Sequence, residues 1–268
     1  MSLFLEPIEI PNPFFIPVYW ISECPSTMDL ARDLIAEKPE GRGLMVLTGH
    51  QTQGRGRQGK KSWVDVPGAA FLSTLWLGPQ FTVMPPLSLR VGLAVARTIE
   101  ESLELPVTLK WPNDIFFSDR KAGGILIENL GPAGHLIGLG LNLRGAPENL
   151  NRPRFTEVTN PREATSLATE ARIWAQRWGE PVPNIPGPRD FAQAYLQRLH
   201  QSLHDLHWRA SVTLRLAYRG KVVVLEPPGV RGTLVGLGEA GEVLLDVPAS
   251  GRKAYFTGSL RLASDSIP

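Results

Sequence analysis

Hydrophobic residues recur at helical spacing in several stretches of this chain. Ser26, with Asp29 three positions later, has the pattern of a helix capping box. The apolar positions 30, 31, 34 and 35 follow it and predict a helix that ends near residue 37. The same spacing predicts helices over residues 85–105, 165–178 and 190–207, with Trp174, Trp178 and the leucines at 196, 199, 203 and 206 on their buried sides.

Shorter apolar runs, bounded by glycine, proline and asparagine, predict β-strands. Beyond residue 106 four such runs follow one another through tight turns, which predicts antiparallel hairpins instead of strand–helix–strand units. Residues 1–19 are rich in proline and phenylalanine and are expected to form an extended N-terminal arm, and residues 144–163 a loop. The expected strands are residues 18–21, 44–48, 69–77, 107–111, 115–117, 122–130 and 135–143.

The pattern changes near residue 211. From there, short β-rich runs alternate with glycine and proline turns, which is typical of a small barrel. We therefore predict two domains, residues 1–210 and residues 211–268. The fold class is expected to be α+β, with a mixed, mainly antiparallel sheet and helices packed on it. The strands expected in the small β-barrel are residues 221–226, 230–237, 242–247 and 253–257.

Composition narrows the class of protein. The 268 residues are 43% hydrophobic, which allows a sizeable core, and their formal net charge is only +2. General nucleic-acid binding is disfavoured, because it would require a larger basic excess. Cys24 is the single cysteine, so the chain forms no internal disulfide and fits a reducing compartment. Neither a signal peptide nor a membrane-spanning run is visible, and we expect a cytoplasmic protein.

Positive charge is concentrated in one glycine-rich stretch, called the basic segment below. Glycines let backbone N–H groups approach a ligand, and guanidinium and ammonium groups bind phosphate or carboxylate oxygens, so the stretch predicts an anion site. Its spacing matches parts of the dinucleotide-binding and P-loop motifs, but no helix start follows it, as both require. A solvated loop without a ligand is the alternative. The basic segment is residues 51–61, with Gly54, Gly56, Gly59, Arg55, Arg57, Lys60 and Lys61.

A second polar cluster lies on the predicted hairpins after residue 106. Pro112 favours a turn that aims Asn113 and Asp114 away from the sheet. Lys110 and Lys121 flank this hairpin, so both ammonium groups are expected to reach one pocket. The alternative is that these side chains are exposed charges whose pairing contributes little to stability.

Four motifs occur in order: Gln51-x-x-Gly-Arg-Gly-Arg57, Lys110-Trp-Pro-Asn-Asp114, Arg120-Lys-x-Gly-Gly-Ile-Leu-x-Glu128 and Gly138-x-Gly-x-Asn142. With Ser26-Thr27 upstream they closely resemble the biotin–protein ligases. The resemblance implies a class II synthetase-like catalytic domain and a C-terminal SH3-like barrel. It also implies that ATP and biotin, with Mg²⁺, form biotinyl-5′-AMP and pyrophosphate. Biotin would then pass to a lysine of the biotin carboxyl carrier domain of acetyl-CoA carboxylase.

The resemblance further implies roles for individual residues. Lys121, Arg57 and Asp114 would be catalytic, with Lys121 stabilising charge on the α-phosphate and Asp114 placing Mg²⁺ or orienting the incoming lysine. Two positions depart from the family: Met28 stands where asparagine is common, and Trp63 is about one residue off its usual spacing. The implied biotin-binding residues are Ser26, Thr27, Gln51, Gly54, Arg55 and Gly124, and the implied nucleotide-binding residues are Arg55, Arg57, Trp63, Lys110, Asn113, Lys121 and Asn142.

Other functions remain as alternatives. A lipoate- or octanoate-attaching enzyme shares the transfer chemistry, but the Gly-Arg-Gly-Arg sequence is a feature of the biotin branch. A ligase that is also a repressor would need a helix-turn-helix module before the catalytic domain, where the proline-rich arm lies, so we expect no specific DNA binding. A non-catalytic RNA-binding module would carry an aromatic signature that is missing here. A homodimer is left open, and a metal site at His200, His204 and His207 is disfavoured, because no glutamate or cysteine completes it.

Overall fold

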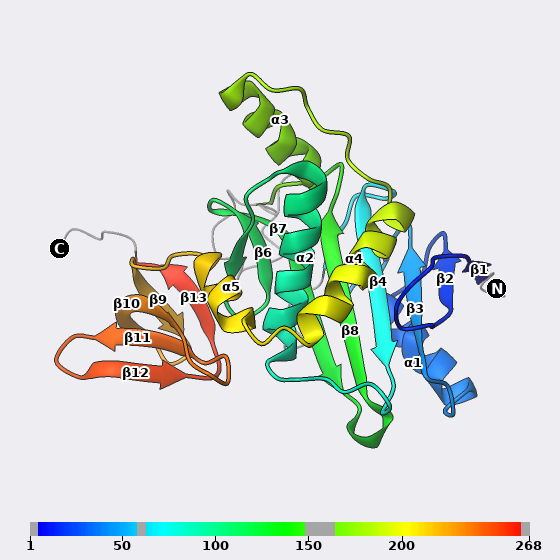
Figure 1. The fold of residues 1–268 in the computed structure, drawn as a ribbon, viewed down its shortest axis with the longest axis horizontal. Helices are drawn as coiled ribbons and strands as arrows, with labels where there is room; N and C mark the ends of the chain where they lie inside the picture. The colour runs from blue at the N-terminus through cyan, green and yellow to red at the C-terminus, as the bar shows by residue number, and fades with distance from the viewer. Residues whose placement is uncertain (1–4, 58–62, 148–163, 264–268) are drawn as a thin grey trace.

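The computed structural model describes residues 5–57, 63–147 and 164–263, which form an eight-stranded and a five-stranded β-sheet (Figure 1). The strands of the large sheet pair antiparallel, except that β2 and β3 are parallel. This confirms the predicted mixed, mainly antiparallel sheet. Its spatial order is β1 (Glu6–Ile8), β2 (Val18–Ile21), β3 (Gly43–Thr48), β4 (Ala70–Leu77), β8 (His135–Asn142), β7 (Arg120–Asn129), β6 (Asp114–Phe117) and β5 (Thr108–Lys110), with the 3-10 turn η2 (Gly131–Ala133) between β7 and β8.

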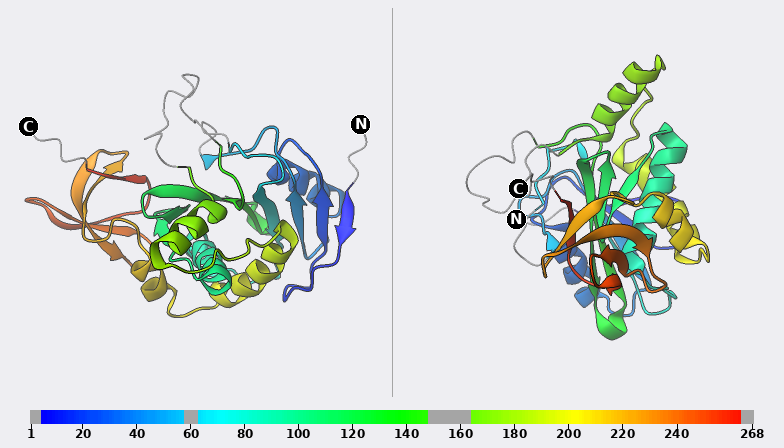
Figure 2. Two further views of the ribbon diagram at one scale, coloured as in Figure 1. Left: turned by 90° about the horizontal axis from the view of Figure 1, so that it is seen from above. Right: turned by 90° about the vertical axis from the view of Figure 1, so that its left-hand side faces the viewer.

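Helices cover both faces of this sheet (Figure 2). Alternate residues of β3 show the division, because successive side chains of a strand point to opposite faces. Leu44 and Val46 pack in a cluster with α1, whereas Met45 and Leu47 pack in the main core with α2 and α4. Every residue of β3 and β4 is therefore buried. The helices are α1 (Thr27–Glu37), α2 (Leu87–Leu103), α3 (Leu167–Trp178), α4 (Pro188–Leu203) and α5 (Trp208–Leu214).

Two helix predictions were wrong in part. The helix predicted over residues 190–207 ends at Leu203, and the separate helix α5 follows it. Leu206 lies between them and is 80% exposed, so it does not continue the leucine stripe. Trp178, predicted to be buried, is 58% exposed, because α3 projects from the body of the molecule (Figure 1).

The N-terminal arm is more integrated than its composition predicts. Residues Glu6–Ile8 form the edge strand β1, which pairs with β2. Phe14 and Ile16 are buried in the main core, and the side-chain amide of Asn12 donates to the carbonyls of Ile10 and Ile16. Burial of apolar side chains therefore holds this proline-rich stretch against the sheet.

The second sheet is antiparallel throughout. Four of its strands were predicted, and β13 was missed. Trp111 connects the two sheets, because its indole N–H donates to the carbonyl of Gly241 at 2.9 Å. Division of the chain at residue 210 and closure of this sheet into a barrel stay predictions. Its spatial order is β12 (Gly251–Tyr255), β11 (Val243–Val247), β10 (Val230–Leu237), β9 (Val222–Glu226) and β13 (Ser259–Leu262).

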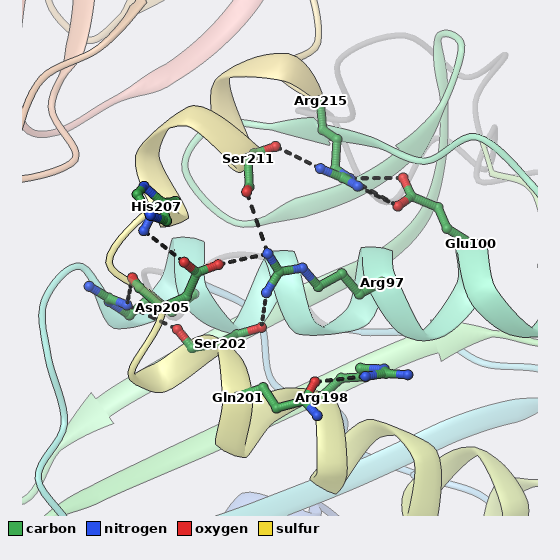
Figure 3. Close-up of polar contacts among 10 residues, drawn as sticks. Arg97, Glu100, Arg198, Gln201, Ser202, Asp205, His207, Ser211 and Arg215 are labelled. Carbon is green, nitrogen blue, oxygen red and sulfur yellow. Dashed lines mark hydrogen bonds and ion pairs between the residues drawn. The ribbon is translucent and has the colours of Figure 1, made fainter.

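Polar contacts join α2 to the segment between α4 and α5 (Figure 3). Arg97 donates to the carboxylate of Asp205 at 2.6 Å, and the backbone N–H of His207 donates to the same carboxylate at 2.7 Å. Arg90 is 1% exposed and donates to the backbone carbonyls of Ser202 and Asp205. These bonds satisfy carbonyls at the C-terminal end of α4, where the helix itself provides no donors.

None of the helices in the described ranges is long and apolar enough to cross a membrane.

We expect Asp205→Asn to destabilise the fold by roughly 1.5–3 kcal/mol at pH 7, the contribution of hydrogen bonds to a charged group. Burial raises the pKa of Asp205, but the bonds from Arg97 and His207 outweigh it and leave the pKa below its usual value. A lowered pKa stabilises the native state above the unfolded-state pKa of about 3.9, and this contribution is lost as pH falls through the folded-state pKa. Urea unfolding should therefore show a nearly constant difference between the wild type and the variant from pH 7 to about pH 5, and this difference should shrink as the pH falls below about 4. A difference independent of pH would contradict this.

Candidate functional site

The site begins at the N-terminus of α1. The side-chain oxygen of Gln51 accepts hydrogen bonds from the backbone N–H of Thr27 at 2.9 Å and from its hydroxyl at 3.1 Å. The hydroxyl of Thr74 on β4 donates to that of Thr27 at 2.8 Å. Ser26 is the N-cap, as predicted, and accepts from the N–H of Met28. Three of the residues predicted to bind biotin, Ser26, Thr27 and Gln51, are thus brought together.

The two ends of the basic segment are held side by side. The N–H of Trp63 donates to the carbonyl of Gly54 at 3.0 Å, and a side chain at position 54 would lie 2.6 Å from the carbonyl oxygen of Trp63. The ring nitrogen Nδ1 of His50 lies 2.8 Å from one carboxylate oxygen of Asp65, and the N–H of Gln51 donates to the other at 3.3 Å. Residues 58–61 of the segment, which include Gly59, Lys60 and Lys61, lie outside the described residues.

Arg55 pairs with carboxylates that flank the basic segment. Its guanidinium lies 2.8 Å from Asp29 and 3.7 Å from Glu128. Arg32 also pairs with both of these carboxylates. Asp29 therefore takes part in an ionic cluster between α1 and β7, and not in the capping box that its spacing predicts.

Arg57 links the basic segment to both sheets. One guanidinium nitrogen donates to the side-chain oxygen of Asn113 at 3.2 Å, and another donates to the carbonyl of Gly258 at 2.8 Å. The amide of Asn113 donates in turn to the carbonyl of Ile125 on β7. Arg57, from the glycine-rich motif, thus lies against the turn at Asn113 in the Lys110–Asp114 motif.

Lys121 and Asp114 form an ion pair. Their nitrogen and oxygen atoms are 2.6 Å apart, although β6 and β7 place the two residues on different strands. Gly124 lies opposite Asp114, and a side-chain carbon at position 124 would lie 3.4 Å from the ammonium nitrogen of Lys121. The ammonium group of Lys110 lies over the ring of Phe116, 5.0 Å from its centre. Since Asn113 and Asp114 are adjacent, Arg57 and Lys121 approach the same turn.

Two polar atoms near the end of β8 lack partners among the described residues. The indole N–H of Trp63 is buried and has no acceptor. The side-chain oxygen of Asn142 is also buried and has no donor. The ring of Trp63 lies against Gly140, and a side chain at position 140 would be 2.7 Å from it. Asn142 uses its amide nitrogen to bind the carbonyl of Thr165 at 2.9 Å. Unsatisfied buried groups are costly, so these atoms are well placed to bind a ligand.

Several residues around the site were missed in the sequence. Asp65 and His50 lie at the base of the basic segment, and Gly258 comes from the second sheet. Glu170 binds Arg120 at 2.9 Å and also accepts from the hydroxyl of Thr165. No local pattern marks any of them, because each acts on a partner from another element. The buried thiol of Cys24 has its pKa raised to about 11 by burial and is unreactive near neutral pH.

Of the described residues, no three or more histidines, cysteines, aspartates or glutamates are grouped so that they could hold a metal ion. The helical histidine spacing is also broken, because His204 is the C-cap of α4 and His207 the N-cap of α5.

An α+β fold with a mainly antiparallel sheet, which brings cations and a glycine-rich segment together, defines the class of an anion-binding domain. The profile of the Biotin/lipoate A/B protein ligase family matches residues 20–142. Residues 20–142 are thus similar to that family.

Individual relatives agree with the family match. The chain is 35% identical over 131 residues to a biotin–protein ligase of Homo sapiens, covering 44% of this chain and 18% of that protein. It is 36% identical over 126 residues to the bifunctional ligase/repressor BirA of Escherichia coli, covering 44% of this chain and 38% of that protein. The matched part is thus less than half the length of these curated relatives.

Solved structures extend the similarity to most of the chain. Biotin protein ligase from Aquifex aeolicus, in complex with biotin and ATP, has a TM-score of 0.69 at 26% identity and covers 92% of this chain and 98% of its own. The enzyme from Leishmania major in complex with biotinyl-5-AMP has a TM-score of 0.58 at 25% identity, with 90% and 98% covered. The predicted α+β architecture is confirmed by these matches.

The packing of Trp63 on Gly140 can be tested by substitution. We expect Gly140→Ala to lower the free energy of unfolding by about 1–3 kcal/mol, because the added methyl group overlaps the indole ring. Trp63→Ala in the same chain should remove the clash and recover part of this loss. Denaturant unfolding measures both effects.

Gly236→Ala is the matched control, since Gly236 also lies in a strand but its added carbon would meet its nearest neighbour at an ordinary 3.4 Å. If Gly140→Ala were no more destabilising than this control, the indole would not occupy the described position.

Proposed function

We propose that this protein is a biotin–protein ligase. It activates biotin with ATP to biotinyl-5′-AMP and transfers biotin to a lysine of the biotin carboxyl carrier domain of acetyl-CoA carboxylase. The observation that carries the proposal is the approach of two cations, Arg57 and Lys121, to the single turn at Asn113 and Asp114. The Aquifex aeolicus structure, described as a complex with biotin and ATP, supports it.

In the first step an oxygen of the biotin carboxylate attacks the α-phosphorus of ATP. A new P–O bond forms, the bond to the β-phosphate oxygen breaks, and pyrophosphate leaves. Two anions must meet, so their repulsion has to be cancelled. Arg57 and Lys121 supply positive charge on two sides of the turn, and such preorganised groups stabilise the charge that develops at phosphorus.

Asp114 balances these cations before the substrates arrive. Its carboxylate holds the ammonium group of Lys121 at 2.6 Å, so the lysine has a fixed position. Arg55 pairs with Asp29 and Glu128, and an arriving phosphate or carboxylate would compete with these acidic partners for its guanidinium.

In the second step the amine of a carrier lysine attacks the carbonyl carbon of the adenylate. The C–N bond forms, the bond from carbon to the phosphate oxygen breaks, and AMP leaves with the electron pair. The amine must lose a proton, and Asp114 is the carboxylate in the described site that can accept a hydrogen bond from the incoming lysine.

Biotin is expected to bind beside the N-terminus of α1. Ser26 and Thr27 are buried there, beside the half-buried Gln51, whose oxygen already accepts from Thr27. The amide nitrogen of Gln51 lies toward Gly54, 3.3 Å from where a side chain at position 54 would begin. Glycine therefore lets the backbone of Trp63 pack closely beside this hydrogen-bond donor, and a fixed donor suits a ureido group in a mainly apolar slot.

A magnesium ion fits this arrangement only as a companion of the nucleotide. Mg²⁺ commonly binds one or two carboxylates together with substrate phosphates and water, and Asp114 supplies one carboxylate. Bound there, the ion would offset phosphate charge.

We also expect a cytoplasmic location, because a single buried cysteine fits a reducing compartment.

Pyrophosphate release tests the proposed function directly. We expect the purified protein to release pyrophosphate from ATP when biotin is present, and to do so much more slowly with lipoate or octanoate. Transfer to an isolated biotin carboxyl carrier domain, followed by mass spectrometry, should add one biotin. Equal rates with lipoate would favour the lipoate-attaching alternative, and no release with either acid would reject both.

Lys121→Met tests the proposed mechanism, because it keeps most of the aliphatic stem and removes the charge. If the ammonium acts mainly on the transition state, adenylate formation should slow by about 10²–10³-fold while biotin affinity changes little. Supplying synthetic biotinyl-5′-AMP should recover part of the carrier labelling, since the first step is bypassed.

Lys253→Met is the control, because Lys253 is an exposed lysine on β12 of the other sheet. Near-normal adenylation by Lys121→Met would show that Lys121 is only a structural partner of Asp114.

A further inference from the structure

A continuous line of hydrogen bonds runs from the sheet interior to the base of the basic segment. The hydroxyl of Thr74 donates to Thr27, and Thr27 donates twice to the side-chain oxygen of Gln51. The backbone N–H of Gln51 then donates to Asp65, and the second oxygen of Asp65 binds His50. Gln51 is therefore fixed at both its side chain and its backbone.

Asp65 is the buried member of this line. Its side chain is 0% exposed, whereas that of His50 is 27% exposed. A carboxylate only accepts hydrogen bonds, so nitrogen Nδ1 of His50 is the one that carries the hydrogen. Burial makes the loss of such a bond costly, because a buried donor without an acceptor cannot hydrogen-bond to water instead.

The position of Asp65 also matters for the basic segment. The backbone pairs Trp63 N–H with the carbonyl of Gly54, and Gly68 N–H with that of Gly49. Asp65 lies between these two pairs along the chain and adds side-chain bonds across the same gap. It therefore fixes the distance between the strand that enters the basic segment and the chain that leaves it.

We propose that Asp65, assisted by His50, is a positioning residue that holds Gln51 in the orientation that binds biotin. The inference rests on the proposed function. With its oxygen fully used by Thr27, Gln51 keeps its amide nitrogen as the group that it can offer to a ligand. Rotation of the Gln51 backbone would turn this donor away. Asp65 prevents that rotation by accepting the Gln51 N–H.

The test uses the full-length chain and separates biotin affinity from ATP affinity. Asp65→Ala should raise KM for biotin by roughly ten- to a hundred-fold, since it leaves the partly buried N–H of Gln51 without its acceptor. KM for ATP and the rate at saturating biotin should change less than threefold. A general loss of structure would alter all three values and lower the melting temperature together with them.

Asp65→Asn keeps the test decisive if the alanine variant folds poorly. Asparagine retains one oxygen for the Gln51 N–H and loses only the charge, so KM for biotin should return to within about threefold of the wild type. His50→Ala should give a smaller increase than Asp65→Ala, because its bond to Asp65 supports Gln51 indirectly. Asp246→Ala, which removes an exposed aspartate paired with Arg252, is the matched control and should leave KM unchanged.

The outcomes separate this inference from the proposed function. A wild-type protein that releases no pyrophosphate with biotin would reject the proposed function itself. An active wild type whose KM for biotin is the same in Asp65→Ala would reject only the positioning role. Equal rises in KM for biotin and for ATP would also reject it and show that Asp65 is structural.

Discussion

Backbone pairing among β4, β8 and β7 is the constraint on which the site depends. These three strands form the centre of the large sheet, and both faces of β4 are covered, so their hydrogen bonds are shielded from water. Shifting one strand by a residue would turn all its side chains to the other face. The register therefore fixes Gly124 opposite Gly140 and places Thr74 below Thr27. The backbone hydrogen bonds between these strands therefore determine the geometry of the site, and the packed core stabilises them.

Charge at the site is compensated before any ligand binds. Lys121 is paired with Asp114, and Arg55 with Asp29 and Glu128. Partly exposed pairs of this kind contribute little to stability, so stability does not account for their arrangement. Instead, these ion pairs hold the flexible cationic side chains in place before a ligand binds. Preorganised charge of this kind needs little rearrangement when phosphate charge develops.

The sequence was informative wherever one segment determines its own structure. Periodic apolar runs predicted α1, α2 and β10 closely. The motifs singled out Lys121, Asp114, Arg57 and Asn113, which the structure brings together in two contacting pairs. It failed where a distant partner decides the outcome. The edge strands β1 and β13 are short, and their pairing partners give them their structure.

The same reason explains the residues of the site that were missed. Asp65 lies in a stretch without periodicity, and its role appears only when Gln51 is brought beside it. Trp178 follows a helical spacing that would bury it against a neighbouring element, but its end of α3 extends past the sheet. A periodic pattern identifies the apolar face of a helix and not what covers that face.

The segment before strand β13 contributes a backbone carbonyl to the site. Arg57 donates to the carbonyl of Gly258, whose φ of 128° is a conformation that L side chains rarely adopt. A side-chain carbon at this position would also lie 2.7 Å from Leu225 of β9. The turn before β13 therefore requires glycine for two independent reasons, and its carbonyl is aimed by the packing of the second sheet. Since Arg57 also binds Asn113, its guanidinium is placed only when both sheets are docked together.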